Sequence, residues 1–302
     1  MDKEKMNDII LLIISMAACL GVMLVRKVYM DRSGSGFAPT FLFNGLSCLV
    51  AAPVIMMFGG FDKVSAFTVL LGIGFGIVTS ISAIATLKAI SIGPVSYTTL
   101  ICSLSTVISA LSGAMFFGET IAPVQIVGMI LMLATFYLAT AKGSGGRRAS
   151  LQWFMYCLIA FICTGGVGVM QKVHQASEYK DEIVPFLVVM FLVSTVFSML
   201  LYLVFRKKEG KNDVWAKSDK KTLVLLFATM AASGIFGALN NQFNLYLCGV
   251  IPAAIFFPVV NGGHLILTTL SALVFFKEKL SVRQWIGIGI GIVSVVLLCN
   301  PF

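Results

Sequence analysis

The fold is decided by the longest uncharged stretch of the chain, residues 222–276, which reads TLVLLFATMAASGIFGALNNQFNLYLCGVIPAAIFFPVVNGGHLILTTLSALVFF. These 55 residues contain no Asp, Glu, Lys or Arg. A helix that crosses a bilayer core of about 30 Å needs about 20 mostly apolar residues, so the stretch is long enough for two helices. The sequence CGVIP at 248–252 supplies the break between them, because proline is favoured at the first position of a helix.

The rest of the chain has the same apolar character. Of its 302 residues, 58% are hydrophobic and 12% are charged, and the mean hydropathy is +0.97. Soluble domains carry about 25% charged residues, so soluble, fibrous and disordered classes are excluded. The sequence predicts a multi-pass protein of the cell (plasma) membrane. Its net charge of +9 does not indicate a nucleic-acid partner, because Lys and Arg lie in short loops between apolar stretches.

The charge-free stretches predict an all-α protein with ten transmembrane helices. These helices cover 9–25, 37–58, 64–87, 94–117, 121–141, 151–170, 183–205, 223–243, 252–276 and 282–298. Acidic residues precede the first stretch, so we interpret it as a retained helix and not as a cleaved signal peptide. The seven cysteines fall inside or at the edges of the spans and are typical of apolar packing residues.

The two halves of the chain resemble each other. A shift of 159 residues aligns parts of 111–128 with 270–287, including Glu119 with Glu278. A shift of 145 residues aligns Lys27 with Lys172. Each half therefore holds five helices, and we expect repeats at 1–142 and 151–302 joined by a basic linker at 143–150. Because five is odd, the second half enters the membrane from the opposite side, which is the inverted repeat of secondary transporters.

Several of the repeated residues resemble the drug/metabolite transporter superfamily, EamA type. The matching positions are Lys27, Asn44, 88–94, 116–119 and Gly128 in the first half, and 251–252, 276–278 and Gly287 in the second. The resemblance implies a ten-helix carrier for small metabolites, often an exporter. Members of the superfamily move amino acids, nucleosides, sugars or drugs, so the resemblance does not define the substrate.

Acidic residues and glycines in this pattern have structural interpretations. Glu119 and Glu278 lie in the tight turns before the fifth and tenth helices, and we interpret each as a cap on the helix that follows it. Transport chemistry is the alternative. Glycines four residues apart permit close helix approach; they are Gly72 with Gly76 and Gly287 with Gly291. We interpret these glycines as sites of helix packing within the chain. The alternative is that they form the contact face of a homodimer.

Polar side chains recur at helical spacing on the fourth and ninth predicted helices. The first stripe is Thr98, Cys102, Ser105, Ser109 and Ser112, and the shift of 159 places it on Phe257, Asn261, His264, Thr268 and Ser271. The eighth helix adds Asn240, Asn241, Gln242 and Asn244. Stripes that face inward would enclose a cavity in the middle of the membrane, whereas hydrogen bonding between helices is the alternative. The predicted substrate contacts are Thr98, Ser105, Ser109, Asn240, Asn244, Asn261, His264 and Thr268.

Charged and titratable groups add three candidates. His264 is the only histidine inside a predicted span, so it is the best candidate for proton coupling; a structural hydrogen bond is the alternative. All thirteen Asp and Glu lie outside the spans or at their rims, which argues against cation exchange through a buried carboxylate. Lys27 and Lys172 lie near helix ends and are added as contacts for an anionic or zwitterionic substrate, although interfacial anchoring explains them too.

The sequence therefore predicts a secondary transporter that exports a small polar metabolite, such as an amino acid or a nucleoside, by alternating access. A receptor or structural membrane protein without transport activity is the alternative. An enzyme is not expected, because the chain lacks clustered groups for metal or nucleophile activation. The expected partners are a small-molecule substrate, the lipid bilayer and, as an option, a second copy in a homodimer. No cofactor, metal or nucleic acid is expected.

The distribution of basic residues predicts an orientation. The loops after helices one, three, five, seven and nine hold 17 Lys and Arg, and the opposite side holds 5. Because cytoplasmic loops are enriched in these residues, we expect both termini outside the cytoplasm. The family resemblance implies the reverse orientation.

Overall fold

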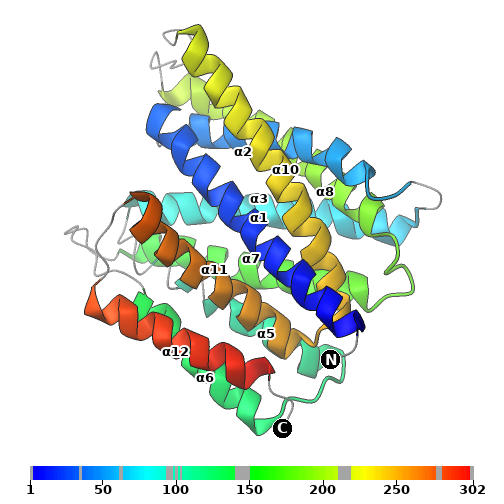
Figure 1. Ribbon diagram of the computed structural model, residues 1–302. Coiled ribbons are helices and arrows are strands. Elements are labelled where there is room, and N and C mark those ends of the chain that lie inside the picture. The colour runs from blue at the N-terminus through cyan, green and yellow to red at the C-terminus, as the bar shows by residue number, and fades with distance from the viewer. Residues whose placement is uncertain are drawn as a thin grey trace. The chain divides into compact units, whose positions relative to one another are not determined.

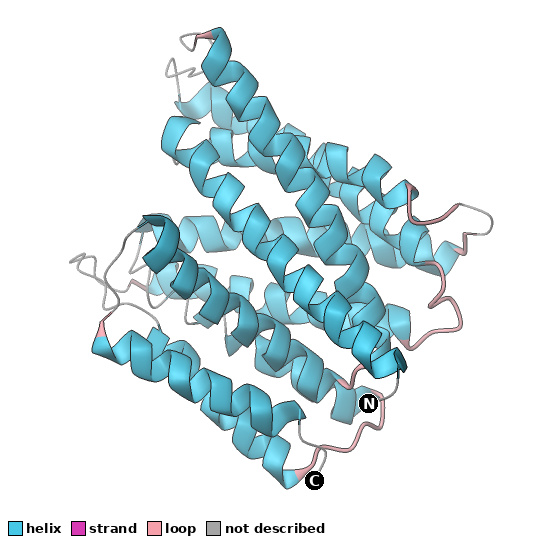
Figure 2. Cartoon of the chain, viewed as in Figure 1, coloured by secondary structure: helices cyan, strands magenta, loops and turns pink. Residues whose placement is uncertain are grey.

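The part of the chain that the structure describes folds into ten α-helices and contains no strands (Figures 1 and 2). The computed structural model describes residues 3–33, 36–60, 64–92, 98, 101–102, 104–139, 150–209, 219–276 and 281–299. The helices are α1 (Lys3–Ser33), α2 (Phe37–Met56), α3 (Ala66–Ile92), α5 (Thr106–Phe116), α6 (Pro123–Ala139), α7 (Leu151–Gln175), α8 (Ile183–Glu209), α10 (Lys220–Val250), α11 (Ala253–Phe276) and α12 (Val282–Cys299). The predicted all-α fold of ten helices is confirmed.

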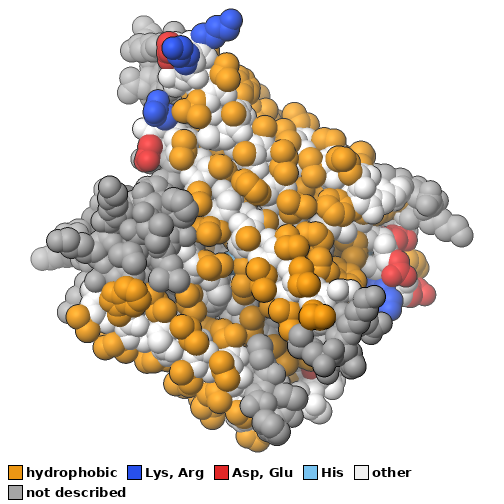
Figure 3. All heavy atoms as spheres, viewed as in Figure 1, with side chains coloured by type: hydrophobic (Ala, Val, Ile, Leu, Met, Phe, Trp, Pro, Cys, Tyr) orange, Lys and Arg blue, Asp and Glu red, His pale blue; other side chains and the backbone are white. Residues whose placement is uncertain are grey.

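The surface of the helices suits a bilayer. Within the described part of the chain, six helices are long and apolar enough to cross a membrane: α1, α2, α3, α7, α8 and α10. Large apolar side chains such as Ile13 and Leu70 are 60% and 69% exposed, whereas Ser15 and Thr98 are fully buried. Figure 3 shows apolar side chains over the helices and charged ones near helix ends. Lipid-facing apolar residues with polar groups inside are typical of transmembrane helices, so the chain is an integral membrane protein.

Several predicted spans differ from the observed helices: α1 ends at Ser33 instead of residue 25, and α10 ends at Val250 instead of residue 243. Two further differences concern polar residues. The fourth span was expected as one helix over 94–117, but Ser105 lies in a turn and α5 begins at Thr106. The sixth span was expected to end at residue 170, but α7 continues to Gln175. The apolar pattern ends at Gln171 and Lys172, and these polar residues are nevertheless buried within the helix. Hydropathy therefore predicted where the helices lie. It did not predict the turn at Ser105 or the burial of polar residues at the end of α7.

The chain forms two compact units that cut across the sequence repeats. Unit 1 comprises Met1–Ser80 and Glu178–Tyr246, and unit 2 comprises Ile81–Ser177 and Leu247–Phe302. Each unit pairs helices that correspond in the two halves: α2 packs on α8 in unit 1, and α5 packs on α11 and α6 on α12 in unit 2. Figure 1 shows α6 and α12 side by side. Each unit is therefore built from both halves of the sequence.

Glycines allow close packing inside unit 1. A Cβ atom added at Gly72 would lie 3.1 Å from the Phe186 carbonyl oxygen, and one at Gly76 would lie 3.0 Å from that of Met190. Both glycines therefore let α3 lie directly against the backbone of α8. The interpretation of this glycine pair as packing within the chain is confirmed.

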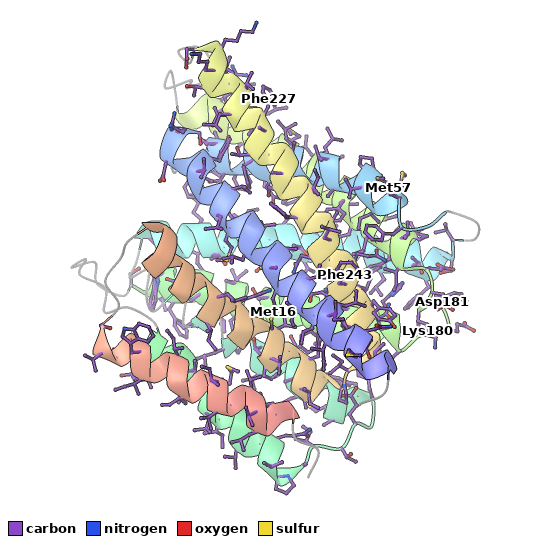
Figure 4. All side chains as sticks on the ribbon, viewed as in Figure 1. Met16, Met57, Lys180, Asp181, Phe227 and Phe243 are labelled. Carbon is purple, nitrogen blue, oxygen red and sulfur yellow. The ribbon has the colours of Figure 1, made fainter. Side chains whose placement is uncertain are left out.

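The connections of unit 1 are held by acidic side chains. The Glu182 carboxylate accepts hydrogen bonds from the Ser65 amide at 3.0 Å and the Ser65 hydroxyl at 2.8 Å, and so joins the loop before α8 to the start of α3. Figure 4 shows the neighbouring Lys180 and Asp181 beyond the helix ends. Asp219 accepts from the Thr222 amide at the start of α10, and its hydrogen bonds to Thr222 hold the pKa of this exposed carboxyl below its usual value.

Unit 2 is held by equally close packing. The Ser294 hydroxyl of α12 donates to the Gly128 carbonyl of α6 at 2.7 Å. A Cβ at Gly291 would lie 2.9 Å from both Thr135 and Ile266. Gly291 therefore packs within the chain, as predicted.

Candidate functional site

Three helices of unit 2 meet at Gly168. A Cβ atom at Gly168 would clash with the Ser109 hydroxyl of α5 and would lie 2.9 Å from Cε1 of Phe257 in α11. The Ser109 hydroxyl donates to the Gly165 carbonyl of α7 at 3.0 Å. Both predicted stripes are therefore brought together here, since Ser109 belongs to the first and Phe257 to the second. The missing side chain on α7 makes this approach possible.

Both stripe helices are irregular near this meeting point. The Ser105 amide and hydroxyl donate to the Cys102 carbonyl at 3.2 Å and 2.6 Å, which closes the turn before α5. In α11, Pro258 lies inside the helix, and the Asn261 amide donates to the Phe257 carbonyl at 2.9 Å. Ser105 is 1% exposed, and Asn261 is half-buried. Side-chain donors thus bind backbone carbonyls in the turn before α5 and at Phe257, directly before Pro258.

Thr98 lies at a different contact of unit 2. Its fully buried hydroxyl accepts the indole N–H of Trp153 at 2.9 Å and lies 3.8 Å from the Cys157 thiol. These contacts join the residue to α7 and satisfy a tryptophan donor that would otherwise be buried without an acceptor. These are hydrogen bonds between helices, the alternative weighed for this stripe, and the role of Thr98 as a substrate contact stays a prediction.

The second stripe is only partly described. His264 is half-buried on α11, and Thr268 lies in the same helix, but its side chain is outside the described residues. The side chain of Lys27 is likewise outside them, although its backbone belongs to α1. The preceding Gly262 packs on Met132, whose side chain occupies the space that a Cβ would need.

The asparagines of α10 belong to unit 1 and converge on one serine. The Asn240 side chain donates to the Ser15 carbonyl at 3.0 Å and to its hydroxyl at 3.1 Å. The Ser15 hydroxyl in turn donates to the Asn244 oxygen at 2.9 Å. Gln242 points to the other side of the helix, and its buried Oε1 atom has no hydrogen-bond partner among the described residues. The sequence analysis singled out the asparagines as polar candidates but not Ser15, because a single serine in an apolar helix forms no recognisable pattern.

Lys172 lies in a buried ion pair at the end of α7. Its ammonium group is 2.5 Å from Oε1 of Glu119 and donates to the Cys248 carbonyl at 3.2 Å. The second carboxylate oxygen of Glu119 accepts from the Ala253 amide at 2.7 Å, at the start of α11. Glu119 was expected to cap the helix that follows it, α6, and this expectation is wrong. The start of α6 is served by Gln125, whose side chain accepts from the Ala122 amide at 3.0 Å.

The prediction that His264 is the only histidine within a span is also wrong. His174 lies in the last turn of α7 and is fully buried. Its Nδ1 atom is 3.1 Å from the Gln175 side-chain nitrogen. The sequence signal was absent, because the polar residues 171–175 look like the start of a loop.

Comparisons with known proteins agree with this architecture. Residues 8–141 and 151–300 each match the model of the EamA-like transporter family. A protein of Hamiltonella defensa subsp. Acyrthosiphon pisum (strain 5AT), named Probable 4-amino-4-deoxy-L-arabinose-phosphoundecaprenol flippase subunit ArnE, is 34% identical over 107 residues, which are 33% of this chain and 92% of that protein. A crystal structure of a further protein has a TM-score of 0.75 and 15% identity, and the similarity covers 97% of this chain and 96% of that one.

The apolar helices and their buried polar contacts define a multi-pass membrane protein. The two family matches cover nearly the whole sequence, so the chain belongs to the EamA-like transporter family. Its fold is two five-helix repeats of inverted topology, and its class is that of a membrane transporter, as the resemblance implied. The repeat boundaries at 142 and 151 stay a prediction.

Proposed function

We propose that this transporter is a secondary carrier that exports a small polar metabolite, an amino acid, a nucleoside or a similar compound, by alternating access. The observation that carries the proposal is the convergence of the two stripe helices at Gly168, where Ser109 and Phe257 lie together. In inverted-repeat transporters the substrate site lies near the middle of the membrane, at the junction of corresponding helices. The helices α5 and α11 are such a pair and pack on each other.

The chemistry of the stripes favours a polar substrate. Ser105, Ser109 and Asn261 each donate a hydrogen bond to a backbone carbonyl. A hydroxyl that donates one bond still has lone pairs to accept others, and an amide carries two donors and an acceptor. We place His264 and Thr268 beside them as substrate contacts, because they follow Asn261 on the same face of α11. Asn240, Asn244, Lys27 and Lys172 are secondary candidates.

A lipid-linked sugar is the second candidate substrate. The relative from Hamiltonella defensa is named as a subunit of a flippase for 4-amino-4-deoxy-L-arabinose-phosphoundecaprenol, and 92% of its length aligns with this chain. A flippase substrate of that kind carries a polar head group and a long apolar tail. Such a molecule needs a path that is open to the lipid, whereas a free metabolite needs a path that is open to water on each side.

Two further points are proposed with this function. We place the carrier in the plasma membrane, in line with the bacterial relative. We propose that it acts as a single chain, because Gly72, Gly76 and Gly291 are used in packing within the chain; a homodimer is the alternative. A receptor without transport activity is the alternative to the function itself.

The test is flux in proteoliposomes that contain the purified chain. Labelled amino acids, nucleosides and sugars are loaded one class at a time, and their release is compared with liposomes that contain the Asn261→Leu variant. We expect release of one class from the parent and at least tenfold slower release from the variant, since about 1.4 kcal/mol of lost substrate interaction corresponds to a factor of ten. A fluorescent polyprenyl-phosphate sugar tests the second candidate. Absence of release for every compound would favour the receptor alternative.

A further inference from the structure

One ion pair holds both ends of the turn between α10 and α11. Lys172 donates to the Cys248 carbonyl, which lies before the turn, and Glu119 accepts from the Ala253 amide, which lies after it. The two side chains are themselves paired at 2.5 Å. We name this set the clamp: Glu119, Lys172, the Cys248 carbonyl and the Ala253 amide. All four groups belong to unit 2.

The turn that carries Glu119 is shaped for this contact. Gly118 has a φ of +65°, a conformation that glycine adopts without strain. The Glu119 amide donates to the Gly113 carbonyl at 3.1 Å. The Glu119 carboxylate lies over Gly113, where any Cβ atom would collide with it. The backbone therefore directs the carboxylate back toward α11 and away from α6.

The clamp is shielded from solvent. The side chains of Lys172 and Glu119 are 9% and 18% exposed, and Cys248 and Ala253 are fully buried. Removing one partner of a buried ion pair leaves a charge without compensation, which is strongly destabilising. Each charged group also makes one hydrogen bond to the backbone: the Lys172 ammonium donates to the Cys248 carbonyl, and the Glu119 carboxylate accepts from the Ala253 amide.

The clamp lies next to the places where the chain passes between the two units. These crossings fall at 80/81 in α3, at 177/178 after α7 and at 246/247 in α10. Lys172 lies five residues before the second crossing, and Cys248 lies two residues after the third. A carrier that works by alternating access must change conformation, and such changes are taken up by a few residues in loops or at helix ends.

We propose that the Lys172–Glu119 ion pair is a conformational latch, which keeps the α10–α11 turn closed and sets how readily this end of unit 2 opens. The inference rests on the proposed alternating-access function for its purpose. Its test does not, because the opening of the turn is measured without any substrate. The labelling test can therefore overturn the latch while transport is observed, and it can support the latch while no transport is observed.

The chain contains its own probe for the latch. Two single-cysteine proteins are made, one that retains Cys248 beside the clamp and one that retains Cys157, which is equally buried in the same unit and contacts Thr98. Labelling by a water-soluble maleimide is followed in native membranes. The variants are Glu119→Gln, which keeps the shape and an acceptor oxygen, and Lys172→Met, which removes the ammonium group.

We expect both variants to label Cys248 about tenfold faster than the parent, because local opening exposes a buried group, and to leave Cys157 labelling unchanged. Lys172→Arg keeps the charge and should label slowly. If Cys248 labelling is unchanged in both Glu119→Gln and Lys172→Met, the ion pair does not hold the turn, and the proposal is overturned. If Cys157 accelerates equally, the pair stabilises the whole unit and is no latch, which overturns the proposal as well.

Discussion

Ser15 is the residue on which the polar network of unit 1 depends. Its hydroxyl contacts the side chains of both Asn240 and Asn244, and it is fully buried. Ser15→Ala removes the shared hydroxyl, so the Asn244 oxygen loses its donor, whereas Asn240 keeps its bond to the Ser15 carbonyl. Loss of one partner in a shielded network costs about 1–3 kcal/mol. We expect a lower thermal unfolding midpoint in detergent. Ile13→Ala is the control, because Ile13 is 60% exposed toward lipid, and an equal loss in this variant would contradict the role given to Ser15.

His264 is the residue whose function is most directly testable. A neutral imidazole donates and accepts, and a polar side chain within a transmembrane helix is a functional candidate. We expect His264→Ala to reduce flux about tenfold or more, equivalent to about 1.4 kcal/mol, at normal membrane abundance. His264→Gln should retain substrate binding and lose any pH dependence, because glutamine does not titrate. Parent-like flux in both variants between about pH 5.5 and 8, which brackets the usual imidazole pKa, would exclude His264 from the site.

Single residues also mark the limit of prediction from sequence. Lys172 was recognised as a candidate because it aligns with Lys27, but its partner Glu119 lies 53 positions away, in the turn between α5 and α6. No local pattern encodes such a pairing. His174 was missed for the same reason, since the burial of Gln171, Lys172 and His174 depends on contacts made by distant segments.

At the scale of elements, the junction of α5, α7 and α11 depends on the absence of one side chain. Gly168→Ala places a methyl group against Ser109 and Phe257, and overpacking of this kind costs about 1–3 kcal/mol. We expect a lower unfolding midpoint and lower flux. Gly166→Ala is the matched control on the same helix, because a Cβ there meets nothing within 4 Å. Similar behaviour of the two variants would mean that the junction is not tightly packed.

The faces of α5 and α11 can be tested by chemistry. Ser105 and Ser109 are buried in the conformation described here, so a reagent reaches them only when the carrier opens. In a cysteine-free background, we expect single cysteines at Ser105, Ser109 and Asn261 to react with a small water-soluble thiol reagent during transport, and the substrate identified by flux should protect them. Leu111 is the control, because it is 37% exposed on the lipid-facing surface of α5. A cysteine there should stay unreactive, since thiolates do not form readily in lipid. Equal labelling of all four positions would show that the stripes do not line a water-accessible path.

Helices were predicted well because the signal is local. Charge-free windows of about 20 residues located each of the ten helices among the described residues, including the break at Pro252 before α11. The turn at Ser105 was missed, because a serine inside an apolar stretch has no distinctive pattern. Serine can bind a carbonyl three residues back, and here it does so at Cys102. Whether such a bond forms depends on the surrounding packing.

At the scale of the whole molecule, the repeats and the compact units are different divisions of the chain. Similarity between the halves predicted two five-helix repeats, and the family matches at 8–141 and 151–300 follow the same division. Contacts instead group α1, α2 and α8 in unit 1, and α5, α6, α7, α11 and α12 in unit 2. Similarity within a sequence reports common ancestry of segments, whereas packing pairs each helix with a complementary partner. Sequence alone could not predict this exchange.

The orientation of the molecule is the last property that the charges predict. The loops on one side hold 17 Lys and Arg, and the other side holds 5. Basic loops are retained in the cytoplasm, so we expect both termini outside. The check is a C-terminal reporter that is active only in the cytoplasm, with the same reporter inserted at residue 212, between α8 and α10, as the positive control. Strong activity at the C-terminus and none at residue 212 would reverse the assignment, and the clamp of Lys172 and Glu119 would then lie on the cytoplasmic side.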